Sequence, residues 1–388
     1  MAAGDTPRTG LVLTGGGARA AYQVGILRAL AHILPRGCPN PFPIICGTSA
    51  GAVNATALAS SAFDFHRAVR RLLLVWRDFH VEQIYRADLS GVIATGARWL
   101  AAMMLGGLGD RNPTSLLDNS PLGELLRERL ELHGVQQSID SGALRAVSVT
   151  TSGYTSGHSV TFFQGVPELT GWQRARRIGV RGTIDIDHLM ASSALPFIFP
   201  AVRIHREYFG DGSMRQIAPI SPALHLGADR VLVIGVGRQL TGHEERVPVE
   251  GHPSLAQIAG HALSSIFLDT LEVDLERLER INRTVRLIPV EERIRSSFPL
   301  REVDVLVIRP SEDLDEIASH YTHTLPRAVR ALFRGVGATS RGGANLLSYL
   351  LFEPGYCRAL IDLGYRDTMA RRDELERFFM TDAQVKAP

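Results

Sequence analysis

The stretch FPIICGTSAGAVNATAL, residues 42–58, predicts a strand, a sharp turn and a helix in immediate succession. The apolar run at residues 42–46 suits a buried strand, and the small residues at 52–58 suit a closely packed helix. Between them, residues 47–51 follow the pattern G-x-S-x-G, whose glycines let two backbones approach without Cβ clashes. The pattern indicates a nucleophile elbow, in which Ser49 stands above the carboxyl end of a sheet at the start of a helix.

A glycine-rich loop lies upstream of this unit. Residues 11–14 read as a buried strand, residues 15–17 are all glycine, and apolar residues then recur at helical spacing from 21 to 34. The resulting β-α-β unit places this loop and Ser49 at the same edge of a sheet. Backbone N–H groups of such a loop form a concave nest that can stabilise an oxyanion. Arg19 either holds the loop in shape or contacts an anionic group of a substrate.

The same loop has other interpretations. Gly15, Gly17 and Ala20 also fit the spacing of a dinucleotide-binding fingerprint. That fingerprint requires an acidic residue at the end of the second strand, but the residues at 46–49 include no carboxylate. The dinucleotide interpretation is therefore disfavoured, and a purely structural turn remains an alternative.

A base for Ser49 must come from elsewhere in the chain. Asp211 lies between Gly210 and Gly212, and a carboxylate on such a bare turn can reach a partner directly. In a dry pocket its pKa would rise toward a value useful for general base catalysis. An ordinary Asp-Gly turn is the structural alternative. Thirteen histidines also leave a Ser-His-Asp triad open, with His158 and His225 as the candidates.

Composition narrows the class of protein. The chain has 388 residues, is 45% hydrophobic and 21% charged, and carries a net charge of only +2, which gives no electrostatic case for nucleic acid. Its three widely spaced cysteines form neither a disulfide framework nor a zinc pattern, so a reducing, cytoplasmic compartment is expected. The polar residues at 1–10 do not resemble a signal peptide, and no apolar stretch is long enough to span a membrane.

The rest of the chain is less specific. Residues 62–132 are mainly helical and could be an insertion that covers the site, and a short helix is expected at 190–197. Further strands are expected at 144–150, 159–163, 230–236 and 303–308, a long helix at 255–281 and a helical, basic tail from 325. Residues 92–108, with Trp99 and Met103, could dock on a lipid surface or simply pack over the core. The tail segments 327–341 and 346–352 are a second docking candidate.

Three motifs together resemble a known family. Residues 15–19, residues 47–51 and Asp211-Gly212, in this order, look like the signature set of patatin-like phospholipases, and residues 191–196 are similar as well. The resemblance extends from about Gly10 to Gly237. It implies a three-layer α/β/α fold with a mainly parallel central sheet and a helical C-terminal extension. The catalytic core would span 8–240, including the insertion at about 62–132, followed by the remainder of the α/β domain at 241–325 and the extension at 326–388.

The resemblance also implies a Ser-Asp dyad that hydrolyses lipid esters without a cofactor or an active-site metal. Ser49 would be the nucleophile and Asp211 its base, with an oxyanion hole formed by the loop of Gly15, Gly16 and Gly17 and with Arg19 beside it. The family usually has Gly or Ala after Asp-Gly; the hydroxyl of Ser213 here could alter the basicity of the carboxylate.

Two alternatives stay open. One is a Ser-His-Asp esterase or thioesterase, and the other is a non-catalytic lipid or nucleotide binder. The expected partners are a lipid substrate and, transiently, a membrane surface, with no nucleic acid. The sequence does not indicate an oligomeric state.

Overall fold

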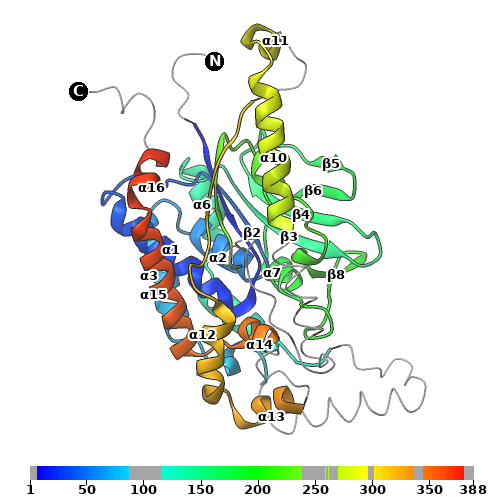
Figure 1. The fold of residues 1–388 in the computed structure, drawn as a ribbon. Coiled ribbons are helices and arrows are strands. Elements are labelled where there is room, and N and C mark those ends of the chain that lie inside the picture. Colours follow the sequence, from blue (N-terminus) through cyan, green and yellow to red (C-terminus); the bar gives the residue numbers. More distant parts are fainter. Residues whose placement is uncertain are drawn as a thin grey trace.

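The computed structural model of the chain describes residues 7–86, 115–237, 270–295, 301–335 and 344–379, and the single residues Ile258 and His261. A ten-stranded sheet runs through the middle of this part of the chain, with helices on both sides (Figure 1). Its main path, in spatial order, is β10 (Asp304–Ile308), β9 (Arg230–Ile234), β1 (Thr9–Leu13), β2 (Ile44–Thr48), β3 (Ala146–Gly153), β4 (Ser159–Gly165), β6 (Arg177–Arg181) and β5 (Trp172–Arg174). The short hairpin of β7 (Val202–Ile204) and β8 (Glu207–Asp211) joins the sheet where β8 pairs with β3.

The five strands from β10 to β3 are all parallel to their neighbours. Beyond them, β4 is antiparallel to β3, and β5 is antiparallel to β6. Strands β1 and β2 are buried along their whole length, as is typical of parallel strands covered on both faces. The predicted mainly parallel central sheet is confirmed, and its parallel strands direct their carboxyl ends to one common edge.

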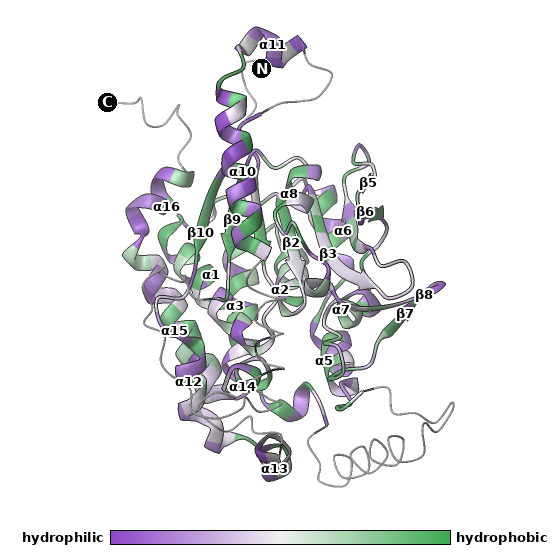
Figure 2. Cartoon of the chain, turned by 45° about the vertical axis from the view of Figure 1, so that its right-hand side comes forward, coloured by the Kyte–Doolittle hydropathy of each residue, from purple (hydrophilic) through white to green (hydrophobic). Residues whose placement is uncertain are grey.

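The side chains of the strands contribute to two separate hydrophobic cores, one on each face of the sheet. Leu11 and Leu13 of β1 belong to the larger core and Val12 to the smaller one, because successive side chains of a strand point to opposite faces. The larger core includes residues of α1 (Ala21–Ile33), α2 (Ala50–Ala59), α3 (Phe65–Arg77) and α15 (Pro354–Ala370). The smaller core includes residues of α8 (Ser221–His225) and α10 (Thr270–Arg286). Figure 2 shows the hydrophobic central strands and the hydrophilic residues along α10. The fold is therefore the expected three-layer α/β/α arrangement.

The C-terminal helices pack against the sheet domain. Helix α15 lies along α1 and α3, and α14 (Ala344–Leu350) packs against the 3₁₀ turn η1 (Gly17–Ala20) (Figure 1). Leu360 and Ile361 of α15 are buried in the same core as Leu27 of α1. The tail from 325 onward thus contributes to the larger core of the molecule.

The other described helices surround these layers. They are α5 (Ser120–Arg129), α6 (His133–Asp140), α7 (Ile186–Ser192), α11 (Val290–Arg295), α12 (Leu314–Tyr321), α13 (Arg327–Gly335) and α16 (Arg372–Phe379), with short 3₁₀ turns η2 (Val81–Gln83), η4 (Gly212–Met214) and η6 (Thr322–Thr324). In the described part of the chain, no helix combines the length and the apolar character that crossing a bilayer would demand.

Several expected boundaries differ from those observed. The strand expected at 42–46 is β2 at Ile44–Thr48, so the chain turns at Ser49 itself. The helix expected at 190–197 was wrong in its bounds: α7 starts at Ile186, where Asp185 caps it by accepting from the His188 N–H, and it ends at Ser192. Pro196 lies beyond this end, and the residue before it, Leu195, is disfavoured from helical angles, so the helix could not have continued through 197. Residues 92–108 and most of the helix expected at 255–270 lie outside the described residues.

Candidate active site

Ser49 occupies a strained turn between β2 and α2. Its backbone angles are φ 55° and ψ −132°, and residues other than glycine rarely adopt such a positive φ. Holding a residue there costs about 1–3 kcal/mol, which the surrounding structure must offset. A Cβ atom at Gly51 would overlap the carbonyl oxygen of Leu13, so only glycine lets α2 start this close to β1. The predicted succession of strand, sharp turn and helix is confirmed.

The main chain of Ser49 is anchored, but its hydroxyl is not used by the helix. The Ser49 N–H donates to Oγ of Ser192 (2.8 Å), and that hydroxyl donates to the Thr150 carbonyl (2.6 Å). A serine at this position usually caps its helix through its side chain, but Ser49 makes no such bond to α2. Its hydroxyl therefore remains available for chemistry.

The register of β3 explains how Asp211 comes close to Ser49. Strand β2 pairs with β3 as far as Thr48, which lies opposite Thr150. The next residue of β3, Thr151, pairs with Asp211 at the end of β8. Strand β8 thus continues along β3 where β2 stops, and it brings residues 162 positions apart (211 − 49) to neighbouring sites at the sheet edge.

Asp211 is a buried carboxylate with few hydrogen-bond donors to stabilise its negative charge. Its exposed fraction is 0%, Oδ1 accepts from the Ser213 N–H (2.9 Å), and Oδ2 has no fully aligned hydrogen-bond donor among the described residues. Burial raises the pKa of Asp211 to about 6, although the nearby Ser49 hydroxyl and the N–H and hydroxyl of Ser213 lower it. Near neutral pH the group is an anion of enhanced basicity, with its free oxygen close to Ser49.

The glycine loop lies beside the same serine. Gly15, Gly16 and Gly17 are all buried, and Gly17 lines a cavity together with Ser49. Among the described hydrogen bonds, none uses the N–H groups of Gly16 or Gly17. Gly17 has φ 54°, and a Cβ atom there would overlap the carbonyl oxygen of Tyr349. The loop therefore combines free backbone donors with close contact to α14.

Arg19 connects the glycine loop to the C-terminal helices. Its guanidinium is buried and bonds to Oδ1 of Asp315 (2.5 Å), Oγ of Ser348 (2.9 Å) and Oδ1 of Asn345 (3.3 Å). It also lies over the ring of Tyr349, 4.0 Å from the centroid. These contacts place Arg19 between η1, α12 and α14, and it does not line the cavity.

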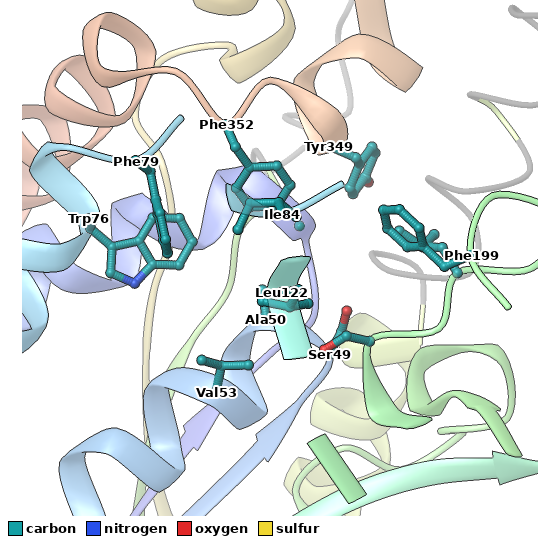
Figure 3. Close-up of a pocket in the computed structure, with 13 residues that line it drawn as sticks. Ser49, Ala50, Val53, Trp76, Phe79, Ile84, Leu122, Phe199, Tyr349 and Phe352 are labelled. Atoms are coloured by element: carbon teal, nitrogen blue, oxygen red, sulfur yellow. The ribbon is translucent and has the colours of Figure 1, made fainter. Parts of the chain in front are cut away.

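An apolar cavity opens beside Ser49, with about 480 Å³ of free space that includes its opening to solvent (Figure 3). It is lined by Gly17, Ser49, Ala50, Val53, Trp76, Phe79, Ile84, Leu122, Ser193, Leu195, Phe199, Tyr349 and Phe352. No lining residue is charged, and most are aliphatic or aromatic. Such a surface suits a hydrocarbon chain, since each buried methylene contributes about 0.8 kcal/mol.

Comparison with known proteins identifies the family. The sequence pattern described as patatin-like phospholipase matches residues 11–224, more than half of the chain. The chain belongs to the patatin-like phospholipase family. This chain is also 29% identical over 216 residues to a "cGAMP-activated phospholipase" of Pseudomonas aeruginosa. That match spans 55% of each protein, so it covers about half the length of the relative.

The solved structures that match this patatin-like chain share less of its sequence than that relative does. Human GIVD cytosolic phospholipase A2, in complex with methyl gamma-linolenyl fluorophosphonate, shares 14% identity at a TM-score of 0.41, covering 96% of this chain and 59% of that one. VipD from Legionella pneumophila shares 14% identity at a TM-score of 0.35, covering 95% of this chain and 67% of that one.

The two histidines considered as bases lie elsewhere in this patatin-like domain. His225 is in α8, stacked on Trp172 with centroids 4.7 Å apart, and His158 lies at the β3–β4 turn. No described hydrogen bond joins either histidine to Ser49 or Asp211, and neither lines the cavity. The geometry gives no support to a triad built on His158 or His225.

Sequence reasoning missed part of this site. The sequence indicates Ser192 only as part of the segment 191–196, and its bond to the Ser49 N–H depends on how α7 docks against β3. The sequence places Tyr349 and Phe352 in a candidate lipid-docking segment of the tail, whereas in the structure both line the cavity. Their aromatic character was visible in the sequence, but nothing local indicates that they lie beside Gly17.

Proposed function

We propose that this protein is a serine acyl hydrolase that cleaves carboxylic ester bonds of phospholipids or other lipids through a Ser49–Asp211 dyad. The observation that carries the proposal is the adjacent placement of these two residues by the pairing of β2 and β8 with β3. Membership of the patatin-like phospholipase family and the apolar cavity beside Ser49 support a lipid substrate. The enzyme would meet its substrate at a lipid surface.

The reaction follows from these positions. Asp211 accepts the proton of the Ser49 hydroxyl while Oγ of Ser49 attacks the ester carbonyl carbon. The N–H groups of Gly16 and Gly17 stabilise the negative oxygen of the tetrahedral intermediate, each by about 3 kcal/mol. The bond to the alcohol then breaks, the alcohol leaves with the proton held by Asp211, and the acyl group remains on Ser49. Water attacks this ester with Asp211 again as the base, which releases the fatty acid and restores the hydroxyl.

Arg19 is a positioning residue in this proposal. Its guanidinium is bonded to Asp315, Ser348 and Asn345, so it holds the glycine loop against α12 and α14. The loop then keeps its free N–H groups aimed at the reacting carbonyl, because preorganised donors cost no reorganisation during the reaction.

Labelling with an alkyl fluorophosphonate tests the nucleophile. The wild type and a Ser319→Ala control, which changes an exposed serine of α12, should be labelled, and Ser49→Ala should not. In a phospholipid hydrolysis assay, Ser49→Ala and Asp211→Asn should each lose activity while remaining folded. Because one relative is named for activation by cGAMP, both assays are run with and without cGAMP.

The possible outcomes separate the alternatives. Full hydrolytic activity in Asp211→Asn would contradict the dyad and point to another base. Absence of labelling in the wild type under both conditions would contradict catalysis by Ser49 and favour a non-catalytic lipid binder.

A further inference from the structure

Three aromatic rings line the side of the cavity away from Ser49. Trp76 of α3, Phe79 just after α3, and Phe352 between α14 and α15 contact one another, with centroids 4.8 Å (Trp76–Phe79), 6.1 Å (Phe79–Phe352) and 6.3 Å (Trp76–Phe352) apart. In Figure 3, Trp76 and Phe79 lie at the side of the cavity farthest from Ser49, with Phe352 beside them. We propose that these three residues, termed here the aromatic wall, set the longest acyl chain that the enzyme accepts. The inference rests on the function proposed above.

The wall is fixed on the side of α3 by a buried polar network. The Trp76 Nε1–H donates to Oδ1 of Asn54 (2.8 Å), and Nδ2 of Asn54 donates to Oε1 of Gln23 (2.9 Å). Nε2 of Gln23 donates in turn to the Thr14 carbonyl (2.7 Å) at the glycine loop. Rotating the indole away would leave the buried Oδ1 of Asn54 without this donor, so the ring stays in place.

The tail side of the wall is fixed as well. Tyr85 donates its hydroxyl proton to the Leu350 carbonyl (3.0 Å), and the Val81 N–H donates to Oε1 of Glu353 (3.4 Å). These bonds join the Leu350 backbone and the Glu353 side chain, on either side of Phe352, to the segment around η2. The Phe352 ring, only 7% exposed, therefore cannot swing outward to admit a longer chain without breaking buried contacts.

Phe352 is the most suitable residue of the aromatic wall to substitute in order to lengthen the cavity. It lies outside any helix or strand, so replacing it does not change helix propensity, whereas Trp76 also serves the polar network. Removing its ring deepens the cavity at the end away from Ser49 and leaves the catalytic groups untouched. Every further methylene that becomes buried should favour the substrate by about fourfold in kcat/KM.

A series of p-nitrophenyl esters, from butanoyl to palmitoyl, tests the wall. In the wild type, kcat/KM should rise with chain length and then stop rising where the chain meets the wall. Phe352→Ala should move this limit to longer chains and Phe352→Trp to shorter ones. Phe79→Leu, a smaller change, should act in the direction of Phe352→Ala. The control is Phe378→Ala, which removes an equally buried phenylalanine of the tail that does not line the cavity, and its limit should not move.

A binding measurement keeps this test independent of catalysis. Ser49→Ala and the double variant Ser49→Ala/Phe352→Ala are titrated calorimetrically with saturated fatty acids of the same lengths. The affinity should increase with chain length up to a limit. If that limiting chain length is greater in the double variant, the result supports the aromatic wall, whether or not the protein hydrolyses esters. An identical limit in folded single and double variants overturns the wall. Failure of fluorophosphonate labelling in the wild type would instead overturn the proposed catalytic function alone.

Discussion

Replacing Asp211 with asparagine removes a charge that folding has buried, so we expect this variant to be more stable than the wild type at alkaline pH. Burial raises the pKa of this carboxyl from 3.8 to about 6. Since a tenfold change in an acid dissociation constant corresponds to about 1.4 kcal/mol, this rise in pKa opposes folding by about 3 kcal/mol once the carboxyl is ionised in both the folded and the unfolded state. Asparagine has the same shape and can still accept from the Ser213 N–H.

The pH dependence follows from the direction of the shift. Between about pH 4 and pH 6 the folded protein binds more protons than the unfolded chain, so wild-type stability falls as pH rises through this window. Below about pH 4 the carboxyl is protonated in both states and the penalty vanishes; above about pH 6 the penalty is complete. The advantage of Asp211→Asn should therefore be present at about pH 8 and absent at about pH 4.

Urea unfolding of both proteins at these two pH values measures the effect. The net gain at about pH 8 should be about 1–3 kcal/mol, because the new amide N–H must find an acceptor such as the Ser49 hydroxyl, and an unsatisfied donor would cost part of the gain. The control is Asp187→Asn, which changes an exposed aspartate in the first turn of α7 and should cost a few tenths of a kcal/mol. Equal stability of Asp211→Asn and wild type at about pH 8, or a gain that does not depend on pH, would refute the reasoning.

Three further predictions concern the same site. The wild-type kcat/KM for a soluble ester should increase with pH and be half-maximal near pH 6, because only the ionised form of Asp211, the proposed base, can accept the Ser49 proton. A half-maximal value at about pH 4 would show that burial does not raise the pKa of the base. Arg19→Gln should lower the free energy of unfolding by roughly 2–3 kcal/mol, since it breaks a buried ion pair whose partner, Asp315, is partly exposed; unchanged urea stability would contradict this. Ser192→Ala should lower kcat about fivefold with little change in KM, because about 1 kcal/mol of support for the Ser49 main chain is lost; steady-state kinetics in which only KM changed would argue against a positioning role.

The local parts of this architecture could be predicted from the sequence. Residues 42–58 encode the elbow because glycine and small residues are the ones that tolerate its backbone angles and close approach. The apolar runs indicated the strands β1, β2, β9 and β10, and the order of three motifs indicated the family, which the comparison confirmed. Boundaries were less accurate, as α7 shows, because caps and docking partners decide where a helix starts and ends.

What the sequence determined about this protein is thus short-range: the Ser49 turn, the glycine loop, the buried strands, and an aspartate held between two glycines. Only the tertiary structure decided that β8 takes the place beside β3 where β2 ends, which puts Asp211 next to Ser49. It likewise decided that the C-terminal tail brings Tyr349 and Phe352 to the cavity. Backbone preferences act over a few residues and leave a trace in the sequence, whereas strand register and the docking of distant helices arise from the packing of the whole core, to which residues hundreds of positions apart contribute.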